Sequence, residues 1–153
     1  MRDREVVNRF CAFYLIGENA YKGDDMDAFL ARALEKMNDM SDQARAELTE
    51  KFLHSMRGNT KLFGRHAFRK SLVSVDGNAA RSILNVALFD ILSVIMADIS
   101  QATLDKSASA LQEAVRSLMN DGAFLSAISY STNSRKQVAR RFEMARSAIQ
   151  GTN

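Results

Sequence analysis

Basic side chains are the residues of this sequence best suited to bind a ligand, and they fall in two clusters. Residues 57–81 hold six bases and one acid, and residues 135–153 hold five bases and one acid, in a chain whose net charge is only +3. The second cluster opens a predicted helix, whose free backbone amides would add to the attraction for a phosphate. Such bases can equally be solvated or pair with acidic residues of the same chain, so both interpretations stay open. The candidate nucleic-acid-binding residues are Arg135, Lys136, Arg140 and Arg141.

The first cluster surrounds the segment KLFGRHAFRKS, residues 61–71, in which aromatic side chains lie among bases. His66, Phe63 and Phe68 resemble residues that stack on nucleic-acid bases. A helix from Arg65 to about Val73 would instead turn Phe68 inward and leave the bases outside. We therefore favour a core-and-turn element over a nucleic-acid site. Its residues are Leu62, Phe63, Gly64, Ala67, Phe68 and Arg69.

The side chains that most often carry catalysis form no recognisable site in this sequence. His54 and His66 have no second ligand at metal-binding spacing, and nothing local pairs either histidine with Cys11 or a serine. Neither GxGxxG nor GxxxxGK occurs, so no phosphate loop is predicted. The acidic run DDMD, residues 24–27, is expected to start a helix rather than to bind a metal. The sequence thus predicts no catalytic residue, no metal and no cofactor.

Asp90 is a carboxylate in unusual surroundings, because it follows Leu88 and Phe89 in the most apolar segment of the chain. A desolvated carboxylate needs a cationic or hydrogen-bonding partner. We expect Asp90 to pair with a base, for which the 57–81 cluster is one candidate source. Exposure to solvent and a catalytic role are the alternatives.

The candidate residues are expected to lie in a chain whose only regular secondary structure is helical. The chain has 153 residues, 46% of them hydrophobic, and no proline, a residue that helix interiors exclude. Apolar residues recur at steps of three and four, which predicts helices over about 3–16, 25–37, 41–57, 65–73, 79–99, 104–120 and 134–149. The fold class is therefore all-α. We predict one domain, residues 1–153, in which six to seven helices surround a central apolar helix at about 79–99.

The sequence favours a cytoplasmic protein with no membrane partner. Cys11 is alone, so no intramolecular disulfide can form, and the first ten residues lack the apolar run of a signal peptide. The apolar segment from Ile83 to Ile99 approaches membrane-spanning length. However, Asn85, Asp90 and Asp98 would each be costly in lipid, so we expect a buried helix there.

Five blocks of this sequence occur in an order that is typical of a known family. They are RDREVVNRFCAFYL at 2–15, YKGDDMDAFL at 21–30, LFGRHAFRK at 62–70, NVALFDILSV at 85–94, and FLSAIS at 124–129 followed by VARRFE at 138–143. In this order they resemble the helical portion of the bacterial GmrSD-type restriction proteins, also described as domain of unknown function 262. The shared order covers most of the chain, which makes the match more specific than any one block.

The resemblance implies a helical module and also marks what this sequence lacks. In the family, catalysis is expected in an N-terminal ParB-like domain with an Asp-Gly-Gln-Gln-Arg motif, and sometimes in a C-terminal His-Asn-His nuclease. Neither motif occurs in these 153 residues. Met1 matches an interior methionine of the family, so we expect the chain to correspond to the helical half without the catalytic half. No catalytic residue can be carried over.

Three hypotheses about function follow. The first is a non-catalytic helical module of a GmrSD-type anti-phage restriction protein, which acts as a scaffold or contacts a ParB-like or nuclease subunit. The second is a DNA-binding helper that uses the bases at 135–141. The third is half of a nucleotide-dependent restriction enzyme that a separately encoded ParB-like half completes.

Overall fold

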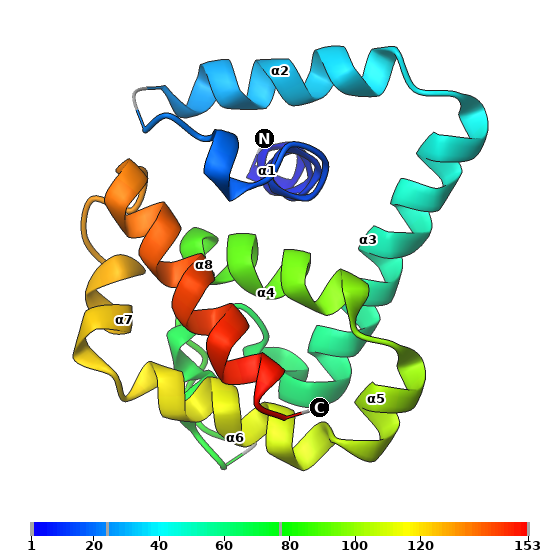
Figure 1. The fold of residues 1–153 in the computed structure, drawn as a ribbon. Coiled ribbons are helices and arrows are strands. Elements are labelled where there is room, and N and C mark those ends of the chain that lie inside the picture. The colour runs from blue at the N-terminus through cyan, green and yellow to red at the C-terminus, as the bar shows by residue number, and fades with distance from the viewer. Residues whose placement is uncertain (1, 24, 77, 153) are drawn as a thin grey trace.

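The computed structural model of this protein describes residues 2–23, 25–76 and 78–152. Within these residues the chain is helical, and the only strand-like pairing is an isolated bridge between Arg69 and Leu84. The predicted all-α fold, a single helical domain, is confirmed (Figure 1). The described residues form α1 Arg2–Leu15, α2 Met26–Asn38, α3 Asp42–Phe63, α4 Val86–Asp98, α5 Gln101–Lys106, α6 Ala108–Met119, α7 Gly122–Ala127 and α8 Arg135–Gln150. Three short 3-10 helices are η1 Glu18–Ala20, η2 Gly64–His66 and η3 Lys70–Val73.

The central helix of the bundle is α4, which the other long helices surround (Figure 1). Every residue from Ala87 to Ala97 is buried, as the predicted apolar rod requires. The helix is shorter than predicted, because it begins at Val86 rather than near residue 79. Asn85 caps it, and its side-chain oxygen accepts a 2.9 Å hydrogen bond from the Leu88 amide. Residues 81–84 before this cap are not helical, and Ile83 is 87% exposed.

The N-terminal helices α1, α2 and α3 form one side of the bundle, and α1 lies inside the angle between the other two (Figure 1). Asp25 and Ser41 cap α2 and α3, where their side chains accept hydrogen bonds from the Asp27 and Ala44 amides. The predicted end of α3 at Gly58 is wrong, since the helix continues to Phe63. Gly58 is buried, and a β-carbon added there would lie 2.9 Å from Met96 Cγ. This glycine allows α3 to approach α4 closely, rather than ending a helix.

The C-terminal helices cover the opposite side of α4. The single helix predicted over 104–120 is two helices, α5 and α6, which meet at Ser107. The helix α7 was not predicted, although Asp121 caps it by accepting hydrogen bonds from Ala123 and Phe124. At the start of α8 only one half of a capping box is formed. Ser134 accepts from the Gln137 amide, but the Ser134 amide donates to the Ser131 carbonyl instead of to Gln137.

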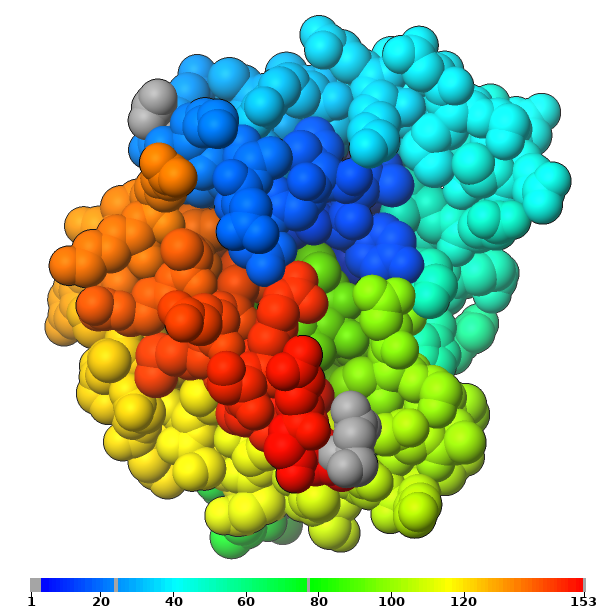
Figure 2. Space-filling model, viewed as in Figure 1, coloured from blue at the N-terminus to red at the C-terminus, as the bar shows by residue number. Residues whose placement is uncertain are grey.

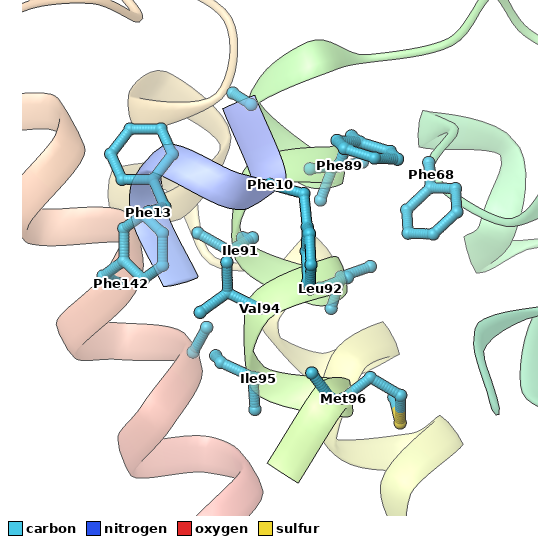
Figure 3. Close-up of a cluster of buried hydrophobic side chains, with 14 of the residues drawn as sticks. Phe10, Phe13, Phe68, Phe89, Ile91, Leu92, Val94, Ile95, Met96 and Phe142 are labelled. Carbon is cyan, nitrogen blue, oxygen red and sulfur yellow. The ribbon is translucent and has the colours of Figure 1, made fainter. Parts of the chain in front are cut away.

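Aromatic side chains join these two sides across α4 (Figure 3). Phe13 of α1 lies 5.2 Å from Phe142 of α8, measured between ring centroids, and Phe68 lies 4.9 Å from Phe89 of α4. All four rings are buried. Burial of each phenylalanine contributes about 1.5–3 kcal/mol. The first contact therefore holds α1 against α8, and the second holds the loop after α3 on α4.

Candidate functional site

Three of the four basic residues predicted to form a surface on α8 reach solvent. Arg135 and Lys136 are exposed on the first turn of the helix, and Arg140 is partly exposed one turn later. Arg141 is not part of this surface. It is fully buried, so its prediction as a nucleic-acid-binding residue is wrong.

Arg141 instead belongs to a buried cluster of three charges with Asp90 and Arg9. Arg9 of α1 holds both carboxylate oxygens of Asp90, with its Nε 2.8 Å from Oδ1 and its Nη2 2.6 Å from Oδ2. Arg141 donates to the same Oδ2 at 2.8 Å, and also to the Thr132 carbonyl before α8. The expectation that Asp90 pairs with a base is confirmed. The suggested source is wrong, because neither arginine comes from the 57–81 cluster.

The electrostatics of this cluster favour a structural role. Burial acts to lower the pKa of Arg9, but the hydrogen bond and charge of Asp90 outweigh it, so this pKa is raised. Burial lowers the pKa of Arg141, which Asp90 only partly opposes and the nearby Arg9 reinforces. Arginine stays charged in proteins, so one carboxylate neutralises one of two guanidinium groups. The cluster ties α1, α4 and α8 together through atoms that solvent does not reach.

A contact with the loop before α2 brings a further basic residue, Lys22, to the start of α8. Gly23, in the loop before α2, has φ +88°, and a β-carbon added there would lie 2.6 Å from the β-carbon of Arg135. Lys22 is exposed next to this glycine. The loop therefore carries Lys22 close to Arg135 and Lys136. Figure 2 shows this N-terminal segment packed against the C-terminal segment.

The segment 62–69 is the predicted core-and-turn element, but its backbone differs from the predicted helix. Leu62, Phe63 and Phe68 are buried, whereas Ala67 is partly buried. Gly64 ends α3 with φ +52°, and Phe68 also has a positive φ of 60°. The predicted helix over 65–73 is wrong, because η2 and η3 occupy it with a left-handed residue between them. Arg69 donates to the Ser82 carbonyl, which fastens the loop that follows.

An apolar groove lies where α1, α2 and α3 meet, and the sequence did not predict it. It consists of two adjoining hollows of about 290 and 370 Å³ that share Val7, Cys11 and Met37. Leu34 on one wall and Val7 on the floor are 49% and 41% exposed. The sequence feature that could have indicated the groove is the width of the apolar stripes on α1 and α2. Each stripe is wider than packing against a single neighbouring helix requires. The other lining residues are Arg4, Asn8, Arg45, Leu48, Thr49 and Phe52.

Polar atoms mark the ends of this groove. Arg4 is exposed and makes no ion pair among the described residues, and Arg45 pairs with the exposed Asp42. The side-chain oxygen of Asn8 is buried and lacks a hydrogen-bond partner in the described structure. Burial raises the pKa of the Cys11 thiol, so this side chain behaves as a small apolar group.

The histidines have structural partners. The His54 ring nitrogen Nε2 lies 2.7 Å from the Ile99 carbonyl oxygen, and the His66 ring nitrogen Nδ1 lies 2.9 Å from the Ser71 hydroxyl. Across 2–23, 25–76 and 78–152, no three histidine, cysteine or carboxylate side chains are grouped to hold a metal. In the same residues, no helix has the length and apolar character needed to cross a bilayer.

Comparison of the chain with models of protein families, with curated proteins and with solved structures finds no match.

Proposed function

We propose that this protein is a non-catalytic helical module of a GmrSD-type restriction system and that it binds a partner subunit. The observation that carries the proposal is the apolar groove between α1, α2 and α3. Its lining presents far more apolar than polar surface, with Val7 and Leu34 well exposed. Contiguous exposed apolar surface of this kind marks interaction sites.

The chemistry of the groove specifies its occupant. Its apolar floor suits the apolar face of a helix, which anchors side chains at three- and four-residue steps. Arg4 and Arg45 in the lining favour carboxylates beside that face. The resemblance supplies the candidate subunit, namely the ParB-like or nuclease component of the same system.

Two valines of equal exposure test this proposal. Val7 lies in the groove and Val73 lies in η3, and each is 41% exposed. We expect Val7→Glu to weaken binding of the separately expressed ParB-like subunit by at least about tenfold, which is about 1.4 kcal/mol. Val73→Glu should leave binding unchanged. Isothermal titration calorimetry measures the affinity, and circular dichroism verifies that both variants fold.

The opposite outcomes reject the proposal. A chain that stays monomeric in gel filtration and ignores the subunit refutes partner binding, and equal loss in both variants refutes the groove. Nucleotide hydrolysis or DNA cleavage by the mixture, but by neither protein alone, would favour the restriction enzyme completed in trans.

DNA binding is the second candidate, and the contact between Gly23 and Arg135 favours it. That contact brings Lys22 to the first turn of α8, beside Arg135 and Lys136. Bases on two separate segments can then face one phosphate backbone together with the helix N-terminus.

A salt titration tests this second candidate. Affinity for a duplex oligonucleotide should fall linearly on a log-log plot of salt concentration, and the triple substitution of Lys22, Arg135 and Lys136 by alanine should flatten that slope. Arg141→Ala is unsuitable as a test, because it removes a buried charge partner. Unchanged DNA binding in the triple variant rejects this surface.

A further inference from the structure

A second exposed surface, distant in sequence from the groove, combines apolar and basic side chains. Ile83 is 87% exposed and Tyr130 is 72% exposed, among the largest values for large hydrophobic residues of the described chain. Leu84 beside Ile83 is 39% exposed. Burial of such exposed apolar side chains by a partner would contribute favourable free energy to binding.

Hydrogen bonds of neighbouring residues join the chain segments that carry these side chains. Asn85 donates from its backbone to the Phe68 carbonyl at 2.8 Å, and from its side chain to the Ile128 carbonyl at 2.8 Å. Lys70 Nζ lies 2.6 Å from the Ser129 hydroxyl, next to Tyr130. The segment before α4 and the turn after α7 are thus joined near the N-terminal end of α4 (Figure 1). Ile83, Leu84 and Tyr130 are therefore exposed on segments that hydrogen bonds hold to the rest of the fold.

The charges on this surface have one sign. Arg69, Lys70 and Arg81 form no ion pair within the described parts of the chain. Arg69 donates to the Ser82 carbonyl, and Lys70 donates to the Ser129 hydroxyl. The pKa of Arg69 is lowered first by burial and then by repulsion from the charge of Arg81. A complementary occupant must carry negative charge.

The apolar side chains decide between an acidic protein and a nucleic acid. Interfaces with DNA are polar and strongly basic, whereas tyrosine and arginine are enriched where proteins meet. An aliphatic side chain such as Ile83 offers no ring for base stacking, which single-stranded nucleic acids use. It suits an apolar side chain of a protein partner.

We propose that this surface, made of Arg69, Lys70, Arg81, Ile83, Leu84 and Tyr130, docks an acidic segment of a partner protein that inserts an apolar side chain beside Ile83. The bases attract the carboxylates, and Ile83 with Tyr130 supplies the apolar contact. This site is independent of the groove between α1, α2 and α3.

An amphipathic acidic peptide tests this proposal on the full chain. The probe has leucine at every third or fourth position and glutamate between, and its two controls replace glutamate by glutamine or leucine by alanine. Titration into isotope-labelled protein should shift the backbone NMR signals of Arg81, Ile83 and Tyr130. Both control peptides should bind at least about tenfold more weakly, because each lacks one half of the complementarity.

Variants locate the binding site and exclude loss of folding. Ile83→Glu and Arg81→Glu change exposed side chains, and each should weaken the peptide at least about tenfold. Leu53→Glu and Arg57→Glu make the same kinds of change on α3, outside the groove and outside this surface, and should have no effect. Signal shifts that map to another face, or affinity unchanged in Ile83→Glu, overturn the proposal. Duplex DNA that displaces the peptide and binds more tightly overturns it in favour of a nucleic acid.

Discussion

Removal of the Asp90 charge is the most demanding perturbation of this fold. Asp90→Asn keeps the shape of the side chain but leaves Arg9 and Arg141, which are 3% and 0% exposed, without a counter-charge. Removing one partner from a buried ion pair costs about 3–5 kcal/mol. That is a large share of the about 5–15 kcal/mol by which a domain is stable. At about 2–4 °C per kcal/mol for a chain of this size, the melting temperature should fall by about 6–20 °C.

Asp98, on the same helix, provides the control. Its side chain is 63% exposed and accepts hydrogen bonds from Lys51 and Tyr14, both at 3.0 Å. Asp98→Asn should cost less than about 1 kcal/mol, because solvent already screens this pair. Urea unfolding followed by circular dichroism measures both variants. Equal midpoints for the two variants would refute the reasoning that burial of two guanidinium groups sets the cost.

A triple variant separates charge from shape. Arg9→Met, Asp90→Leu and Arg141→Met together replace the buried cluster by apolar side chains of similar volume. Such replacements are often neutral or stabilising by about 1–4 kcal/mol. A triple variant as unstable as Asp90→Asn would show that hydrogen bonds such as the one from Arg141 to Thr132, rather than the buried charges, hold the three helices.

Two further predictions concern the core. Gly58→Val should destabilise the fold by about 1–3 kcal/mol in urea unfolding, because a β-carbon there lies 2.9 Å from Met96 Cγ. Gly122→Ala is the control and should change stability little, because the space around Gly122 is open. Unchanged stability of Gly58→Val would show that α4 can shift to accommodate the larger side chain. Because burial raises the pKa of Cys11, the folded state retains this proton longer than the unfolded chain. The free energy of unfolding should therefore fall above the ordinary thiol pKa of about 8.5, by up to about 1.4 kcal/mol per pH unit. Cys11→Ala should remove that part of the slope, and an identical pH profile in this variant would contradict the assignment.

Periodicity and caps predicted the helical architecture because both act locally. Asp25, Ser41 and Ser134 each cap the helix that the sequence predicted. Gly58 misled the prediction because a glycine after a base is typical of a helix end, and only the distance to Met96 reveals its packing role. The start of α4 was predicted too early for a related reason. Ile83 continues the apolar run, yet Leu84 pairs with Arg69 in an isolated bridge, and α4 begins only after it.

The candidate sites were harder to predict because they depend on distant segments. The sequence showed that Asp90 needs a base, but Arg9 and Arg141 lie 81 and 51 residues away, so no local spacing could select them. Arg141 shares its helix with exposed bases, and helical position alone did not show that it faces α4. The groove and the surface around Ile83 require the arrangement of three or more segments. The residue pattern of one helix does not predict how several segments are arranged relative to one another.

The buried charge cluster also has a consequence for synthesis on the ribosome. Translation produces Arg9 and Asp90 before Arg141, so a nascent chain that has just completed α4 can form only two thirds of this contact. Until α8 emerges, Oδ2 of Asp90 has the hydrogen bond from Arg9 but lacks the second one, which Arg141 later donates. Both α1 and α8 must be present before all three side chains of the cluster are in contact, and we therefore expect native packing to be acquired late, as a single cooperative event.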